Sequence, residues 1–196
     1  IAGTIVDGEG GPGSAAGDTI SQLIYEALDS KDLKALVVRV DSPGGSVTAS
    51  EKIRLAIAAA KAKNIPVVVS MANLAASGGY WVSLPADVIF ADPSTITGSI
   101  GIFGVIPSAE AGLAKIGVNA DGVKTTPLSG EPDVLNGFSA EFDRVAQSAI
   151  ENGYRQFLTR VATARKKTPE QVDAIAQGRV WAGGTARQLG LVDRSG

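Results

Sequence analysis

Apolar and polar residues alternate in blocks along the chain, and the blocks predict an α/β protein. Short runs rich in Val and Ile are typical of buried parallel strands, and apolar residues spaced three or four apart are typical of amphipathic helices. The predicted strands cover residues 1–6, 34–41, 65–72 and 86–92, and the predicted helices between them include 19–30, N-capped by Asp18, and 47–63. This alternation predicts a mainly parallel sheet with helices on both faces.

The C-terminal part, from about residue 139, is predicted to be helical. A long amphipathic helix is expected over 139–167, with an apolar face made by Phe142, Val145, Ala149, Ile150, Phe157, Leu158 and Val161. The sequence TPEQ at 168–171 predicts a capping box with proline at the first helical position. A chain of 196 residues is long enough for one domain with a sizeable core, and we expect residues 1–196 to form a single domain.

Composition excludes several kinds of chemistry. The net charge is −2 and no basic stripe is present, so nucleic acid is not an expected partner. The chain has no cysteine and no histidine, which removes disulfides, thiolate sites, the usual zinc ligand and the usual general base. We therefore expect no metal and no cofactor. The chain opens at Ile1 without an initiator Met, and we expect it to have been cut from a longer protein that holds any membrane anchor upstream.

Two unusual turns follow neighbouring predicted strands, at the sheet edge where ligands of parallel sheets bind. The turn DSPGGS (41–46) contains Gly44 and Gly45, whose N–H groups could face an oxyanion, although glycine is also common in simple tight turns. The stretch NLAASGGYW (73–81) places Ser77 among small residues, where it could be a nucleophile or a helix N-cap. Together the turns predict a serine nucleophile with two oxyanion donors, one of them the Gly78 N–H.

The general base of such a serine must come from a residue other than histidine. Lysine can serve if its surroundings favour the neutral amine. Most of the lysines lie in segments that predict solvated positions, and Lys124, in GVKTTPLSG, is the one strong local candidate. The alternative is that Lys124 is an exposed lysine at a strand end.

Four motifs resemble those of the signal peptide peptidase A family of serine peptidases. They are RVDSPGGSVTASE, MANLAASGGYWVS, PSTITGSIGIFGV and GRVWAGGTARQLGLVD, in the family's order and spread over nearly the whole chain. The resemblance is especially close to the C-terminal half of the long, tandem-domain bacterial form. It implies a ClpP/crotonase-like α/β fold and a Ser/Lys catalytic dyad.

The resemblance also implies a role for individual residues. Ser77 matches the nucleophile, Gly45 and Gly78 match the oxyanion donors, and Ser99 matches a serine that hydrogen-bonds the catalytic lysine. In the short form of the family, a lysine-containing motif supplies the base, but here Lys124 matches its first, non-catalytic lysine and Ser129 occupies the base position. In the tandem form the base comes from the N-terminal half, so we expect the lysine to lie outside this chain.

By resemblance, the whole protein degrades cleaved signal peptides and other apolar peptides at the periplasmic face of the bacterial inner membrane. It would form a homo-oligomeric ring, such as a tetramer, held by the upstream anchor. The apolar residues Ile100, Ile102 and Phe103 could line a peptide cleft, or be buried in a core or a subunit contact. Two other functions stay open: a crotonase-type acyl-CoA enzyme and a non-catalytic half of a tandem peptidase.

Overall fold

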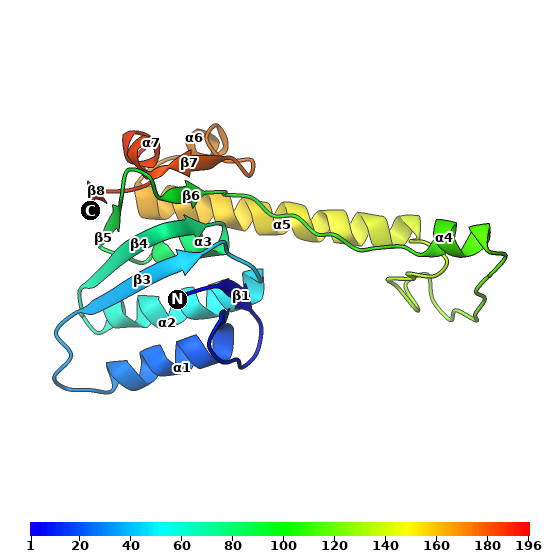
Figure 1. Ribbon diagram of the computed structural model, residues 1–196, viewed down its shortest axis with the longest axis horizontal. Coiled ribbons are helices and arrows are strands. Elements are labelled where there is room, and N and C mark those ends of the chain that lie inside the picture. Colours follow the sequence, from blue (N-terminus) through cyan, green and yellow to red (C-terminus); the bar gives the residue numbers. More distant parts are fainter. The chain divides into compact units, whose positions relative to one another are not determined.

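A computed structural model describes all 196 residues, which divide into two compact units. The first unit consists of Ile1–Gly101 and Gln156–Gly196, and the second of Ile102–Arg155. Figure 1 labels their helices and strands. The expectation that residues 1–196 form one peptidase domain stays a prediction.

The first unit is built on a six-stranded, mainly parallel sheet. Its strand order is β7-β6-β4-β5-β8, and β3 pairs with β4 off this path. The strands are β3 (Leu36–Ser42), β4 (Val67–Ala76), β5 (Val88–Ala91), β6 (Ile96–Gly98), β7 (Val180–Ala182) and β8 (Arg194–Ser195). Only the β6–β7 pair is antiparallel. The predicted α/β fold with a mainly parallel sheet is therefore confirmed.

The long strand β4 brings two chain segments to the same end of the sheet. Its residues 68–70 pair with β5, whereas its last residues, 74–76, pair with β6. The register sets Ala76 opposite Gly98, so the turn after β4 lies beside the turn after β6. Both turns are among the stretches that the sequence singled out.

The N-terminal segment lies against the turn that follows β3. β1 (Thr4–Val6) and β2 (Ser14–Ala16) form a small parallel sheet of their own. In addition, the Ile5 N–H donates to the Gly44 carbonyl at 2.8 Å, and the Ser46 N–H donates to the Ile5 carbonyl at 2.8 Å. The DSPGGS turn is thus held by residues almost forty positions away in the sequence.

Three helices follow β2, β3 and β4 in turn: α1 (Gly17–Leu28), α2 (Val47–Ala62) and α3 (Gly78–Ser83). Ser46 caps α2 by accepting a hydrogen bond from the Ala49 N–H at 3.2 Å. The prediction that Asp18 caps α1 is wrong. The helix begins at Gly17, two residues earlier than predicted, so Asp18 lies in its first turn and forms an ion pair with Lys52 at 2.6 Å.

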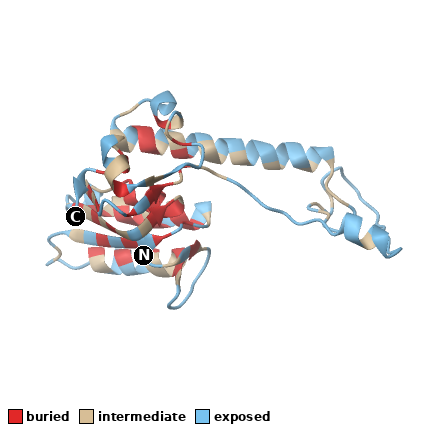
Figure 2. Cartoon of the chain, turned by 45° about the horizontal axis from the view of Figure 1, so that its top comes forward, coloured by how far each residue is buried: buried red, intermediate tan, exposed pale blue.

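The predicted sheet flanked by helices is confirmed, but one face of β3 has no cover. Val38 and Val40 are buried, whereas Val37 between them is 67% exposed and Arg39 is exposed. This alternation means that one face of the strand packs against the protein interior while the other is open. Figure 2 shows the buried residues of the sheet and of the helices behind it in red.

The C-terminal helices differ from the prediction mainly in burial. The long helix exists as α5 (Ala140–Arg165), but only Phe157, Val161 and Ala162 are buried, and Val145 is 54% exposed. The apolar face is therefore buried only in the last turns, which belong to the first unit. The capping box is confirmed at α6 (Pro169–Asp173), where Thr168 and Gln171 satisfy each other's N–H groups. The last helix is α7 (Gly183–Gln188).

The second unit contains α4 (Glu110–Lys115) and the first turns of α5, and none of its residues is buried. Figure 2 shows no red in this segment. Its exposed large apolar residues are Phe103, Val105, Ile106, Ile116, Val118, Val123, Leu128, Val134, Leu135 and Val145. No helix anywhere in the chain is long and apolar enough to cross a membrane.

Tyr80 joins α3 to the C-terminal segment of the first unit. Its side chain is fully buried, and its hydroxyl donates to the Leu191 carbonyl at 2.8 Å. Burial is the main reason why the pKa of Tyr80 is raised. The same segment is held by Arg165, which makes two hydrogen bonds to the Asp193 carboxylate, at 2.6 and 3.1 Å.

The Tyr80 hydroxyl gives a direct test of this packing. Tyr80→Phe should lower the free energy of unfolding by about 1–3 kcal/mol, because the buried Leu191 carbonyl loses its partner. Tyr25→Phe is the matched control, since Tyr25 is 47% exposed and should change stability by less than about 0.5 kcal/mol. Urea unfolding of the two purified variants measures both values. Equal stabilities would show that the hydroxyl contributes nothing.

Candidate active site

Ser77 occupies a sharp turn between β4 and α3. Its backbone has φ 51° and ψ −118°, a conformation that is rare for any residue other than glycine. Hydrogen bonds hold the turn on both sides: the Ser77 N–H donates to the Gly98 carbonyl at 2.9 Å, and its carbonyl accepts from Tyr80 and Trp81, both at 2.9 Å. Backbone strain of this kind is concentrated at functional sites, where surrounding contacts maintain it.

The Ser77 side chain is not used as a helix cap. The residue stands at the N-cap position of α3, but its hydroxyl accepts no hydrogen bond from the helix. The residue is half-buried, so part of its surface stays open to a ligand. The Ser77 side chain therefore does not cap the helix, and its hydroxyl is available for chemistry.

Two backbone N–H groups beside Ser77 make no hydrogen bond within the chain. They belong to Gly45, in the turn after β3, and to Gly78, the first residue of α3. The two residues are close, since a Cβ atom built on Gly78 would lie 3.2 Å from the Gly45 nitrogen. Two unpaired N–H groups near a serine hydroxyl can bind the negatively charged oxygen that develops during acyl transfer.

Glycine is required at this junction for steric reasons. A Cβ atom on Gly44 would lie 2.5 Å from the Gly78 nitrogen, and one on Gly45 would collide with the Ile5 carbonyl. Both residues also have positive φ angles, 95° and 148°. The alternative explanation of the GG pair, a tight turn alone, accounts for these angles but not for the contact with Gly78.

Ser99 lies beside the Ser77 turn. It directly follows Gly98, whose carbonyl accepts the Ser77 N–H, and its own N–H donates to the Arg179 carbonyl at 2.8 Å. Like Ser77 it has a positive φ angle, 49°, and its hydroxyl makes no hydrogen bond to the local backbone. Ser77, Ser99, Gly45 and Gly78 thus all belong to the first unit, and the turns that carry them adjoin one another.

Lys124 lies in the second unit and is held by acidic partners. Its ammonium group is 3.3 Å from the Asp133 carboxylate and 3.6 Å from that of Glu131. The pKa of Asp133 is lowered to about 2, first by hydrogen bonds from Asn136 and then by the bond from Lys124. A general base has to receive the serine proton, whereas the Lys124 ammonium group is already engaged by two carboxylates. These contacts argue against Lys124 as the base.

The apolar residues proposed to line a peptide cleft have different surroundings. Ile100 is fully buried, so it belongs to the core of the first unit and is not a cleft wall. Ile102 is half-buried, and Phe103 is 86% exposed, both in the second unit. The interpretation of this stretch as core is therefore right for Ile100 only.

Glu51 connects the helices around the Ser77 turn, a role that sequence patterns did not reveal. Its carboxylate accepts hydrogen bonds from Arg54 on α2, Arg160 on α5 and the indole N–H of Trp81 on α3, the shortest at 2.8 Å. The Trp81 ring also packs against Phe157, with ring centroids 4.5 Å apart. Partial burial works to raise the pKa of Glu51, but the three donors outweigh it and lower the pKa to about 2.

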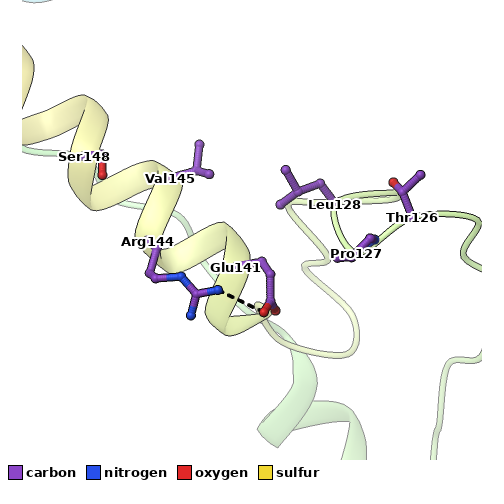
Figure 3. A pocket seen from close by; sticks show the side chains of 7 residues that line it. All are labelled: Thr126, Pro127, Leu128, Glu141, Arg144, Val145 and Ser148. Carbon is purple, nitrogen blue, oxygen red and sulfur yellow. Dashed lines mark hydrogen bonds and ion pairs between the residues drawn. The ribbon is translucent and has the colours of Figure 1, made fainter.

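A surface pocket of about 510 Å³ lies within the second unit. Figure 3 shows that the loop residues Thr126, Pro127 and Leu128 face Glu141, Arg144, Val145 and Ser148 of α5. Arg144 and Glu141 form an ion pair at 3.0 Å along the helix. None of the predicted catalytic residues lines this pocket.

Comparisons with known proteins agree with the fold and the motifs. A family model described as Peptidase family S49 matches residues 59–196. The chain is 55% identical to Protease 4 of Salmonella typhi over 194 residues, which cover 99% of this chain and 31% of the relative. It is 36% identical to "Serine protease SPPA, chloroplastic" of Arabidopsis thaliana, over 94% of this chain and 28% of the relative. The chain thus spans about a third of the length of these curated relatives.

A solved structure shows the same fold at low sequence identity. A ClpP1 mutant from Listeria monocytogenes matches with a TM-score of 0.65 and 17% identity, over 100% of this chain and 88% of that one. Fold and relatives together define a serine peptidase class with a ClpP-like α/β architecture. Within that class, the chain belongs to peptidase family S49, which confirms the predicted resemblance to the signal peptide peptidase A family.

The low pKa of Glu51 makes the packing around α3 sensitive to acid. Because the pKa of this group falls from 4.5 to about 2 on folding, its stabilising effect is complete above pH 4.5 and is lost as the pH falls toward 2. At pH 7, Glu51→Gln should lower the free energy of unfolding by about 1–2 kcal/mol, allowing for solvent screening. Melting temperatures measured between pH 7 and pH 2 should converge for the two proteins.

The control for this experiment is Glu26→Gln on the exposed side of α1, where Glu26 accepts one hydrogen bond from Gln22. Its melting temperature should follow that of the wild type at every pH. A constant difference between Glu51→Gln and wild type down to pH 2 would contradict the argument.

Proposed function

We propose that this chain carries the nucleophile and the oxyanion hole of a serine endopeptidase. The observation that carries the proposal is the strained Ser77 turn, which presents a free hydroxyl beside the unpaired N–H groups of Gly45 and Gly78. In the first step, the Ser77 oxygen attacks the carbonyl carbon of a peptide bond and its proton passes to the base. The carbonyl oxygen becomes negative and accepts hydrogen bonds from the two N–H groups. The amine leaves with the proton, and water then releases the acyl group.

The general base of this reaction is a lysine outside this chain. Lys124 pairs with two carboxylates, and in the first unit Lys52, Lys61 and Lys63 are also paired with acidic residues. Relatives about three times as long leave room for a further domain that supplies the lysine. In this mechanism Ser99, whose hydroxyl has no local partner, hydrogen-bonds the incoming lysine.

The family resemblance supports a proposal for the substrate class and the location. We infer that the longer protein degrades cleaved signal peptides and other apolar peptides at the periplasmic face of the bacterial inner membrane. An anchor in a part of the protein outside this chain would hold it there. A reaction that needs only backbone donors and a serine suits an extended peptide, because it makes few demands on the side chains near the cleaved bond.

The second unit supports the proposal of a homo-oligomer. It has 54 residues, none of them buried as a whole residue, and a segment of this size needs an apolar core to be stable. Its exposed apolar residues, among them Phe103 and Val123, would gain that burial in contact with neighbouring subunits. A ring of subunits, such as a tetramer, would cover the segment in every copy.

The catalytic proposal is tested by substitutions in the longer protein. Ser77→Ala should lower the rate of peptide hydrolysis by at least about 10³-fold, because the nucleophile is removed. Lys124→Ala should leave the rate close to that of wild type. Ser94→Ala is the control, since Ser94 is an exposed serine bonded only to Asp92. Hydrolysis of a fluorogenic apolar peptide gives all three rates.

Three outcomes would contradict the proposal. Unchanged hydrolysis by Ser77→Ala would make this half of the protein non-catalytic. Loss of activity in Lys124→Ala, with the protein folded and assembled, would place the base inside this chain. Saturable binding of an acyl-CoA in place of peptide hydrolysis would favour the crotonase-type alternative.

The assembly proposal is tested by placing a charge on the second unit. Phe103→Glu should shift the protein to smaller species in sedimentation velocity, because a buried carboxylate without a partner disfavours the contact. Val37→Glu, at an exposed position of the first unit, serves as the matched control and should keep the wild-type distribution. Identical distributions for both variants would exclude this segment from the contact.

A further inference from the structure

In the turn at residues 43–46, only the Gly45 N–H is free to bind a ligand. The other N–H groups of this stretch are absent or already hydrogen-bonded within the chain. Pro43 has no N–H. The Gly44 N–H donates to the Ser42 hydroxyl oxygen at 3.1 Å, and the Ser46 N–H donates to the Ile5 carbonyl at 2.8 Å. This leaves the Gly45 N–H, which makes no hydrogen bond within the chain. Gly45, and not Gly44, can donate to an oxyanion because the Gly44 N–H is already bonded to the Ser42 hydroxyl.

That partner, the Ser42 hydroxyl, is itself fixed. Ser42 is fully buried, and its hydroxyl donates to the Gly3 carbonyl at 2.7 Å. With its hydrogen directed to Gly3, the oxygen turns a lone pair toward the Gly44 N–H. A buried hydroxyl that both donates and accepts has a single orientation, so it holds the Gly44 peptide in one plane.

Surrounding contacts leave little space for another arrangement. Gly44 lies close against Gly78, and Gly45 lies close against Ile5. The Gly44–Gly45 peptide is thus held between the N-terminal segment and the start of α3. Glycine residues have the widest conformational freedom of all, so two in succession need such restraints to keep one geometry.

We propose that Ser42 is a positioning residue for the oxyanion hole. By accepting the Gly44 N–H, it fixes the peptide before Gly44, while the Ile5 N–H holds the Gly44 carbonyl at 2.8 Å; together they direct the Gly45 N–H to the space that the Gly78 N–H faces. Ser42 does not contact the substrate, and its effect reaches the reaction only through Gly45. This inference rests on the proposed function of Ser77, Gly45 and Gly78.

The role predicts a particular kinetic pattern in the longer protein. Ser42→Ala should lower kcat by about 10- to 100-fold, somewhat less than the loss of a whole oxyanion donor, and should change KM by less than about twofold. A peptide aldehyde forms an adduct whose oxygen occupies the oxyanion hole, whereas a peptide product does not need the hole. The affinity for the aldehyde should therefore fall with kcat while the affinity for the product stays the same.

Thr95→Val provides a control for the loss of a buried hydroxyl. Thr95 is 1% exposed, and its hydroxyl donates to the Ala72 carbonyl at 2.7 Å, away from the DSPGGS turn. This variant should lose stability as Ser42→Ala does but keep its kcat and its aldehyde affinity. If Ser42→Ala retains both within about twofold of wild type, or if Thr95→Val loses both equally, Ser42 has no positioning role.

The experiment separates this inference from the proposed function. Should Ser77→Ala retain full activity, the proposed function fails and the aldehyde should not form an adduct with any variant. Should Ser77→Ala be inactive while Ser42→Ala matches wild type, the function stands and only the role of Ser42 is rejected.

Discussion

The candidate active site depends on one close contact between two backbone turns. The turn after β3 and the turn after β4 approach so closely that a side chain at Gly44 or Gly78 would collide with its neighbours, and a side chain at Gly45 would collide with Ile5 of the N-terminal segment. Side-chain packing cannot hold this contact, because the glycine residues that form it have no side chains. It is maintained instead by hydrogen bonds from the N-terminal segment and by helix α3, whose own position is fixed by Tyr80 and Trp81.

The local part of this arrangement could be predicted from the sequence, because it follows from residue types at strand ends. Valine-rich runs indicated the parallel strands, and the glycine-rich turns indicated where the backbone would be open to a ligand. The role of Glu51 could not be predicted, since its partners Trp81 and Arg160 lie 30 and 109 residues away. The same holds for Ser42, whose partner Gly3 comes from a segment that looked like an ordinary strand.

Patterns of apolar residues were a poorer guide to burial than to secondary structure. Val37 and Val145 lie on strands and helices as predicted, yet both are largely exposed. Hydrophobic periodicity shows which face of an element is apolar, but not whether something within the same chain covers it. For Val145 and the rest of the second unit, the missing cover can belong to other parts of the protein or to other subunits, since the relatives are about three times as long.

The backbone of Ser77 has a consequence for how the protein could have been selected. A left-handed conformation costs a non-glycine residue of order 1–3 kcal/mol, and glycine would occupy the same turn without that cost. Serine at position 77 therefore lowers the free energy of unfolding relative to glycine at the same position. Selection for stability alone would favour glycine at position 77. The serine found there therefore indicates that selection has also acted on its hydroxyl group.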